Sequence, residues 1–162
     1  MAQLYPETNF LGIEIRKPLV EFANRAKNEL GLTNLHYIFG NINSSATALL
    51  STLPQDSLKT VSVQFPDPWF KKKHHKRRVI QPELVTILVD YLAPEGRVFL
   101  QSDIEEVAIQ MRDRFAEDSR LILHSNWLET NPLSVPTERE LYVLEQNLPV
   151  YRALLKKHHK IS

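Results

Sequence analysis

Residues Phe65 to Arg78 read FPDPWFKKKHHKRR, and this stretch carries the strongest indication of the fold. The stretch begins at the end of residues 61–65, in which apolar and polar side chains alternate as they do in a β-strand. Pro66 and Pro68 stop that strand and restrict the backbone, so Asp67 is presented on a stiff turn. Open α/β sheets carry their chemistry at the carboxyl ends of strands, so Asp67 is a candidate functional carboxylate.

The positive charge that follows this turn suits a phosphate backbone. Trp69 offers a flat surface on which a base could stack, and six of the 20 basic residues lie between Lys71 and Arg78. The other 14 basic residues accompany 19 acidic ones, so the positive charge is concentrated, as expected for a nucleic-acid contact. A basic run is also typical of a solvated loop, and Pro-Asp-Pro is common in turns. The combination in one short stretch favours function.

Composition limits the possible classes of protein. A chain of 162 residues is predicted to form a single domain, residues 1–162. Cysteine is absent, which excludes disulfides, cysteine-ligated zinc and a catalytic thiol. No apolar run approaches the length of a membrane-spanning helix, so we expect a soluble cytoplasmic protein without a membrane partner. Lys156, Lys157 and Lys160 predict a frayed, soluble tail at the end of the chain.

Strands and helices are predicted to alternate along the chain. This order argues for an α/β fold with a parallel sheet that helices cover on both faces. No repeat, low-complexity linker or domain boundary interrupts the order. The predicted strands are residues 9–15, 35–39, 61–65, 97–101 and 121–123, and the predicted helices are residues 18–30, 45–53, 83–92 and 104–116.

The stretch from Phe65 through Glu83 resembles the signature of the tRNA (guanine-N7-)-methyltransferases, which are S-adenosylmethionine-dependent enzymes with a Rossmann-like fold. NFLGIEIR (Asn9 to Arg16), the pair Ser102-Asp103 and PTERE (Pro136 to Glu140) extend the resemblance over nearly the whole chain. The resemblance implies methyl transfer from S-adenosylmethionine to N7 of the guanine at position 46 in the tRNA variable loop. It further implies tRNA as partner, no metal, and a monomer or a homodimer.

Two residues are candidates for binding the cofactor. Glu14 ends a predicted strand, where a carboxylate can accept hydrogen bonds from both hydroxyls of a ribose. An ordinary acid at a strand end is the alternative, but Gly12-Ile13-Glu14 matches the family's ribose-binding segment. Asn41 follows the next strand, where related enzymes often carry Asp or Asn near the adenine.

The glycine-rich loop of the family is missing from this sequence. That loop follows the first strand, about 20 residues before the ribose acid, whereas 13 residues precede Glu14 here and all four glycines are isolated. We therefore expect an N-terminally shortened domain whose sheet lacks its first strand and exposes apolar surface where that strand would pair. We expect this loss to impair cofactor binding and activity.

The chemistry proposed for Asp67 follows from the target atom. Guanine N7 has an available lone pair, so it needs no general base before it attacks a methyl group. The useful work of Asp67 would be to orient the guanine and to stabilise the growing positive charge. The resemblance assigns Asp67 to catalysis and to the cofactor site, and Lys71 to the substrate. It assigns RNA binding to Lys73, His74, His75, Lys76, Arg77 and Arg78.

Three further positions have both a structural and a functional interpretation. Asp103 follows a strand and could cap the next helix, while the resemblance assigns it to the substrate. Thr137 and Glu140 fit a capping box, while the resemblance assigns both to substrate binding.

His74 and His75 suit phosphate or solvent better than a metal, because no second ligand set has suitable spacing.

Two other functions remain open from the sequence. An amino-methyltransferase acting on adenine or a protein amide uses a similar turn, although the Pro-Asp-Pro-Trp order and the basic block fit it poorly. A non-catalytic RNA-binding module is the alternative from another class, because the glycine-rich loop is absent.

Overall fold

The computed structural model describes residues 1–158, except for the side chains of Lys72, His75 and Lys76. The chain divides into two compact units, Met1–Ser45 and Ala46–Ser162, called the first and the second unit below. The single domain expected over residues 1–162 stays a prediction. None of the described helices is both long and apolar enough to cross a membrane.

The first unit is a β-α-β segment. Strands β1 (Phe10–Glu14) and β2 (Leu35–Phe39) run parallel, and α1 (Lys17–Glu29) connects them. Pro18 occupies the first turn of α1, where its missing N–H costs nothing, and Gly31 follows the helix with a φ of 64°. The side chain of Asn24 bonds both the N–H and the C=O of Tyr37, which fastens α1 to β2.

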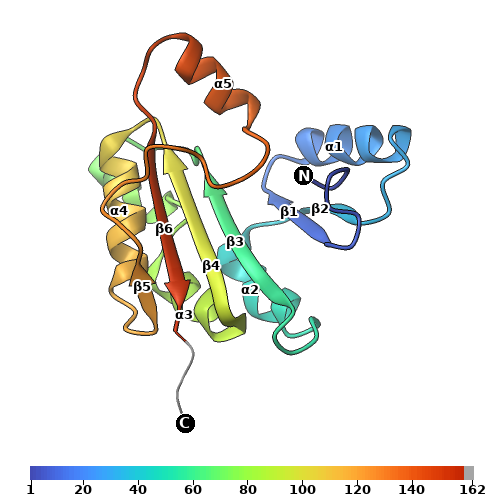
Figure 1. The fold of residues 1–162 in the computed structure, drawn as a ribbon, viewed down its shortest axis with the longest axis horizontal. Helices are drawn as coiled ribbons and strands as arrows, with labels where there is room; N and C mark the ends of the chain where they lie inside the picture. Colours follow the sequence, from blue (N-terminus) through green and yellow to red (C-terminus); the bar gives the residue numbers. More distant parts are fainter. Residues whose placement is uncertain (159–162) are drawn as a thin grey trace. The chain divides into compact units, whose positions relative to one another are not determined.

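The second unit contains a mixed four-stranded sheet in the order β3-β4-β6-β5. β3 and β4 are parallel, whereas β6 runs antiparallel to both β4 and β5. Figure 1 shows α3 and α4 behind this sheet and α5 beyond the carboxyl ends of β3 and β4. The elements are α2 (Ile42–Leu50), which spans the division between the units, β3 (Leu58–Gln64), the 3₁₀-helix η1 (Lys72–Arg77), α3 (Pro82–Tyr91), β4 (Leu92–Ser102), α4 (Glu105–Ala116), β5 (Leu121–Leu123), α5 (Glu138–Glu145) and β6 (Tyr151–Lys157).

The core of the second unit is centred on β4. Val98, Phe99 and Leu100 are almost completely buried between neighbouring strands and the helices, together with Phe115 of α4 and Leu155 of β6. Fully burying side chains of this size stabilises a fold by about 1.5–3 kcal/mol each. This packing fixes the edge of the sheet at which β3 and β4 end, called the carboxyl edge below.

The described strands form sheets of two and four strands, and not one seven-stranded sheet. In the described residues β1 pairs only with β2, and β3 pairs only with β4. Large apolar side chains of the first unit are exposed, including Leu11 on β1, Phe39 on β2 and Phe22 on α1. The α/β fold class expected from the sequence is therefore confirmed.

β4 is longer than the predicted strand at residues 97–101. It begins at Leu92 and includes the turn Pro94-Glu95-Gly96, where the register to β3 shifts. Glu95 has a φ of 63°, and a Cβ on Gly96 would lie 2.7 Å from the carbonyl oxygen of Ala93. The sequence Pro94-Glu95-Gly96 predicts a turn before the strand, but in the structure it forms a bulge within β4.

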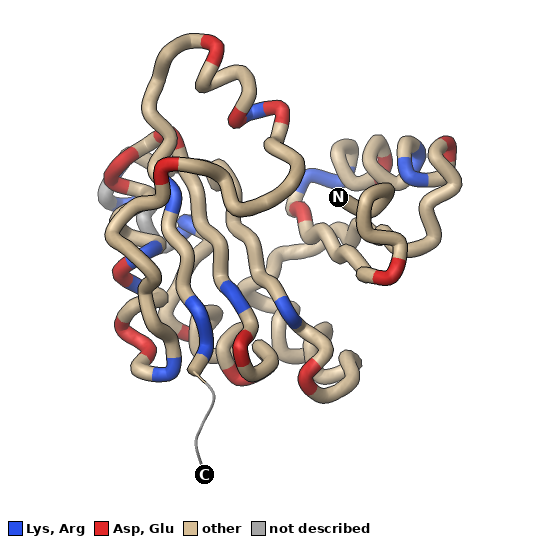
Figure 2. Tube along the Cα trace, in the orientation of Figure 1, with Lys and Arg blue, Asp and Glu red and all other residues tan. Residues whose placement is uncertain are grey.

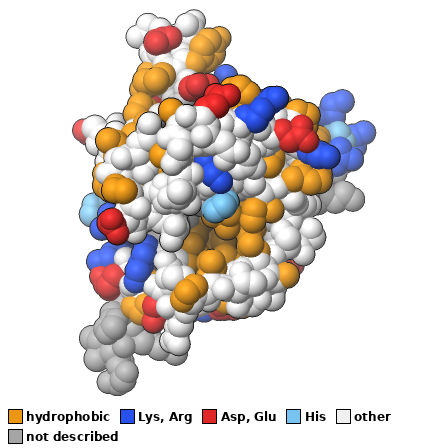
Figure 3. Space-filling model, turned by 90° about the vertical axis from the view of Figure 1, so that its right-hand side faces the viewer, with side chains coloured by type: hydrophobic (Ala, Val, Ile, Leu, Met, Phe, Trp, Pro, Cys, Tyr) orange, Lys and Arg blue, Asp and Glu red, His pale blue; other side chains and the backbone are white. Residues whose placement is uncertain are grey.

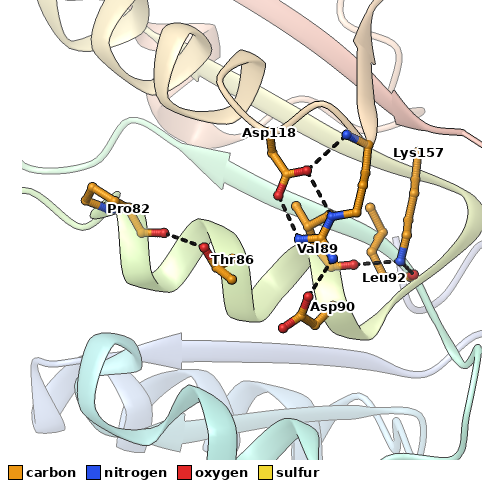
Figure 4. A network of polar contacts seen from close by, with 8 residues as sticks. Pro82, Thr86, Val89, Asp90, Leu92, Asp118 and Lys157 are labelled. Carbon is orange, nitrogen blue, oxygen red and sulfur yellow. Dashed lines mark hydrogen bonds and ion pairs between the residues drawn. The ribbon is translucent and has the colours of Figure 1, made fainter.

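The frayed tail predicted from Lys156 and Lys157 is wrong, because both residues belong to β6. This strand pairs on both sides and buries Ala153 and Leu155. Lys157 Nζ donates to the carbonyl oxygens of Val89 and Leu92, both at 2.6 Å, at the end of α3 (Figure 4). Burial, together with the charge of Arg120, lowers the pKa of Lys157. Lys160 lies outside the described residues.

The opposite edge of the same sheet carries charges that pair with one another. Arg120 donates to Asp118 through Nε at 2.9 Å and Nη2 at 2.7 Å, and to Asp90 through Nη1 at 2.5 Å. These hydrogen bonds hold the pKa of Asp118 below its ordinary value. Figure 2 shows basic positions on β3, β4 and β6 near acidic positions in the turns at this edge.

Candidate active site

The segment that follows β3 holds two aromatic residues in an unfavourable backbone conformation. Phe65 has a φ of 49° and Trp69 a φ of 42°, on either side of Pro66-Asp67-Pro68. The N–H of Phe65 donates to Gln101 O at 2.8 Å, which anchors the start of the segment on β4. Such conformations cost on the order of 1–3 kcal/mol each and cluster at functional sites. We call residues 65–78 the Asp67 loop.

Asp67 is exposed on this loop and makes no hydrogen bond or ion pair with the described residues. It lines an open pocket of about 360 Å³ whose wall is largely apolar. A free carboxylate in a partly apolar surface is available for a ligand. The pocket is lined by Asp67, Pro68, Trp69, Phe70, Lys71 and His74.

The two aromatic side chains of the pocket differ in what they contact. Trp69 has the guanidinium of Arg77 over its ring at 5.1 Å and the ring of His74 against it at 5.8 Å. Phe70 is 66% exposed. The sequence pattern indicated Trp69 as the stacking surface, but Phe70 presents the more accessible ring. The only sequence signal for Phe70 was an aromatic residue between Trp69 and the basic block.

Most of the predicted RNA-binding residues lie on or beside η1. Lys71, Lys73 and Arg77 are exposed and His74 is half-buried. Figure 3 shows Lys, Arg and His side chains gathered at one margin of the surface. The side chains of His75 and Lys76, which were also predicted to bind RNA, lie outside the described residues.

Arg78 differs from the other basic residues of the loop because it is only 4% exposed. Its Nε donates to Pro68 O at 2.7 Å. Its Nη1 donates to Gln110 Oε1 at 2.7 Å, and its Nη2 donates to Glu106 Oε1 at 2.8 Å. A guanidinium engaged in this way has no face directed to a phosphate, which argues against the RNA contact predicted for Arg78.

Asp103 follows β4 as Asp67 follows β3, and the parallel register aligns Gln64 with Gln101. Both carboxylates therefore follow strands that end at the carboxyl edge. The capping interpretation of Asp103 is wrong: α4 has no side-chain cap from it, and the Oγ of Ser102 accepts the N–H of Ile104 at 3.1 Å instead. The carboxylate of Asp103 accepts a hydrogen bond from Arg139 of α5.

The capping box predicted at Thr137 and Glu140 is half formed. The Oγ1 of Thr137 accepts the N–H of Glu140 at 3.1 Å, so Thr137 caps α5. The carboxylate of Glu140 turns inward, where it accepts from Arg152 Nη2 at 2.7 Å and from Asn131 Nδ2 at 2.6 Å. Glu140 is 1% exposed, which argues against the direct substrate contact predicted for it.

Glu140 belongs to a buried polar network that the sequence reasoning missed. Gln101 Nε2 donates to Glu140 Oε2 at 3.2 Å and to Gln64 Oε1 at 2.7 Å, so the network reaches the end of β3. Burial raises the pKa of Glu140, but the hydrogen bonds from Arg152, Gln101 and Asn131 outweigh burial and leave that pKa below its ordinary value. The sequence signal for this network was a glutamine at the end of each of two predicted strands, Gln64 and Gln101.

Two of the three predicted cofactor residues, Glu14 and Asn41, lie together in the first unit. Glu14 ends β1 and Asn41 follows β2, and the N–H of Gly40 donates to Glu14 O at 3.1 Å. The side chain of Arg16 donates to the Glu14 carboxylate at 3.0 and 3.2 Å. These hydrogen bonds lower the pKa of Glu14. An ionised carboxylate and an exposed amide at neighbouring strand ends fit the hydroxyls of a ribose and the edge of an adenine.

In the part of the chain that the structure describes, no group of three or more His, Asp or Glu side chains is arranged to hold a metal ion.

Comparison with known proteins assigns a family to this chain. A family model described as "Putative methyltransferase" matches residues 1–153. A tRNA (guanine-N(7)-)-methyltransferase of Synechocystis sp. is 55% identical over 159 residues, which are 97% of this chain and 75% of that protein.

Two solved structures support the same fold. The precorrin-6y C5,15-methyltransferase of Geobacter metallireducens matches with a TM-score of 0.58 at 15% identity, over 94% of this chain and 70% of that chain. A SAM-dependent O-methyltransferase of Thermotoga maritima matches with a TM-score of 0.54 at 12% identity, over 95% of this chain and 51% of that chain. At such identities the likeness shows the Rossmann-like methyltransferase fold alone.

Proposed function

Because this chain belongs to the tRNA (guanine-N7-)-methyltransferase family, we propose that it transfers a methyl group from S-adenosylmethionine to N7 of a guanine in tRNA. The target is the guanine at position 46 of the variable loop. The proposal rests on the side chains that the Asp67 loop presents. In a largely apolar pocket, the loop presents a carboxylate that has no partner among the described residues, and basic side chains extend from the same loop.

Asp67 orients the guanine and does not serve as a general base. The lone pair of N7 is already available, so no general base is needed. The carboxylate of Asp67 accepts hydrogen bonds from the N–H groups of the guanine and orients the base. Methylation leaves the base positively charged, and a carboxylate fixed beforehand next to that charge stabilises the transition state more than the ground state.

The first unit supplies the cofactor contacts in this proposal. Glu14 binds the ribose hydroxyls and Asn41 binds the adenine edge. When bound, S-adenosylmethionine supplies an electrophilic methyl group on a sulfonium. The carboxylate of Glu14 is ionised at neutral pH, because Arg16 lowers its pKa, and it can accept two hydroxyl donors at once.

The basic residues of the Asp67 loop supply affinity for the tRNA backbone. Lys73, His74 and Arg77 lie along η1, where phosphates can approach, and Lys71 lies in the pocket beside the target base. Asp103 and Thr137 follow at the same carboxyl edge and contact the substrate. With tRNA as the partner, the reaction takes place in the cytoplasm, and the protein acts without a metal as a monomer or homodimer.

A tRNA transcript with 7-deazaguanine at position 46 tests the reaction directly. Transfer of a radiolabelled methyl group should occur with the unmodified transcript and should stop with 7-deazaguanine, because the attacking atom is missing. Equal transfer to both transcripts would reject N7 of that guanine as the target.

Calorimetric titration with S-adenosylmethionine separates the enzyme from a non-catalytic RNA-binding module. Saturable binding that Glu14→Ala abolishes is the expected result. An RNA-binding module would bind tRNA and show no heat with the cofactor.

A further inference from the structure

Arg78 is a buried arginine at the end of the most basic stretch of the chain. Each of its three guanidinium nitrogens donates one hydrogen bond, to the carbonyl oxygen of Pro68 and to Gln110 and Glu106 of α4, at 2.7–2.8 Å. Its own carbonyl oxygen accepts from Gln81 Nε2 at 2.7 Å. A buried charge is stable only when it is paired and hydrogen-bonded in this way.

These hydrogen bonds close the Asp67 loop on itself. Pro68 directly follows Asp67, and Arg78 lies ten residues further along the chain. The guanidinium therefore joins the part of the loop that carries Asp67 to α4, which packs against β4 and β6. Phe65 and Trp69 hold positive φ angles on either side of Asp67. Such a conformation persists only where surrounding contacts impose it, and Arg78 supplies such a contact.

We propose that Arg78 is a positioning residue, which holds Asp67 in place for methyl transfer by clamping Pro68 to α4, and that it does not bind RNA. This inference rests on the proposed role of Asp67 in catalysis. A displacement of about 1 Å at a catalytic group can cost on the order of 10²-fold in rate. Loosening the clamp therefore slows the chemical step without removing any group that contacts tRNA.

Arg78→Lys separates positioning from RNA binding, because it keeps the positive charge. A lysine at a phosphate contact still neutralises the phosphate, so tRNA affinity and its salt dependence would survive the change. A single ammonium on a flexible stem cannot reproduce a planar guanidinium that reaches a carbonyl, an amide and a carboxylate in fixed directions. The clamp is therefore broken although the charge remains.

The test measures single-turnover methyl transfer at saturating tRNA, together with tRNA binding across salt concentrations. For Arg78→Lys we expect a rate lower by about 10- to 100-fold, with tRNA affinity and salt slope within about twofold of the wild type. Lys73→Ala should show the opposite pattern: weaker binding, a smaller salt slope and a smaller loss of rate at saturation. A wild-type rate for Arg78→Lys would overturn the proposal.

Gln110→Ala tests the same clamp from α4 without a change of charge, and it decides the outcome if Arg78→Lys fails to fold. It removes one acceptor of Arg78 and should lower the rate several-fold with an unchanged salt slope. The double variant Arg78→Lys/Gln110→Ala should lose little more than Arg78→Lys alone, because both changes break one contact. Fully additive losses, or a wild-type rate for Gln110→Ala, would count against the clamp.

Two controls separate this proposal from the function on which it rests. Arg97→Lys makes the same substitution at an exposed position on β4 and should leave rate and affinity unchanged. Asp67→Ala with a wild-type rate would reject the catalytic role of Asp67. A slow Asp67→Ala variant beside a fast Arg78→Lys variant would reject only the role of Arg78.

Discussion

Two carboxylates near the carboxyl edge of the four-stranded sheet have opposite surroundings. Glu140 is buried and accepts hydrogen bonds from Arg152, Asn131 and Gln101, whereas Asp67 is exposed and has no partner among the described residues. The family pattern suggests a functional role for both. In this pair, the buried carboxylate with satisfied oxygens holds the fold, and the exposed carboxylate is available to a substrate.

The largest effect is expected at the buried carboxylate. Glu140→Gln leaves the charge of Arg152 buried without its counterion, so the free energy of unfolding should fall by about 3–5 kcal/mol at pH 7. Urea denaturation measures this difference. Glu145→Gln, on the exposed side of the same helix, is the control and should change stability by less than about 0.5 kcal/mol. Equal stability of both variants would show that the network does not hold the fold.

The pH dependence of stability sharpens the same point. The folded-state pKa of Glu140 lies below its ordinary value of 4.5. The stabilisation is therefore complete above pH 4.5 and is lost as the pH falls through the folded-state pKa. The difference in unfolding free energy between wild type and Glu140→Gln should shrink on acidification. A difference that stays constant from pH 7 to pH 3 would contradict this assignment.

Asp67→Ala should depress turnover far more than tRNA affinity, because the phosphate contacts come from the basic residues of the loop. Removing one well-placed electrostatic interaction typically costs on the order of 10²–10³ in rate. Asp67→Asn should retain part of the activity, because its amide oxygen still accepts a hydrogen bond. Single-turnover rates across pH decide between orientation and base catalysis: the loss of rate should be similar at every pH, with no recovery as the pH rises.

Phe70→Ala should weaken tRNA binding by a smaller amount. Stacking of one base on an aromatic ring contributes about 1–3 kcal/mol, and Phe70 is the more exposed of the two aromatic rings in the pocket. Phe70→Tyr keeps a ring of similar size and should bind tRNA nearly as the wild type does. Ile122→Ala on β5 removes an exposed apolar side chain outside the pocket and is the matched control. Equal losses for Phe70→Tyr and Phe70→Ala would argue against stacking.

The smallest effect concerns the basic side chains that face the phosphates. Replacing both Lys73 and Arg77 with Ala should flatten the plot of log affinity against log salt by about 0.7–0.9 for each phosphate that is no longer neutralised. Filter binding over a salt series measures the slope. Lys59→Ala removes an exposed charge at the start of β3, away from the carboxyl edge, and should leave the slope unchanged. A similar change of slope in the Lys73/Arg77 double variant and in Lys59→Ala would mean that tRNA affinity depends only on the net charge of the protein.

Much of the fold follows from local patterns in the sequence. The boundaries of β2 and β5 agree with the predicted strands, and those of α1, α3 and α4 agree within about one residue. Periodicity and helix-ending residues such as Gly31 act locally, so they can be recognised without knowing the partner. β6 was missed because its strand character comes from pairing with β4 and β5, and its lysines resemble a solvated tail.

The candidate site was predictable only in part for the same reason. Local sequence specifies the Pro-Asp-Pro turn after β3, because two prolines restrict their own backbone. It also favours exposure of Asp67 and of most basic residues, because charged side chains are rarely buried without a partner. Which of these charges turn inward depends on tertiary packing. Arg78 meets Gln110 and Glu106, and Glu140 meets Arg152, across 12 to 32 residues of chain. Such pairings depend on how helices and strands pack, and residue type or spacing along the chain cannot specify them.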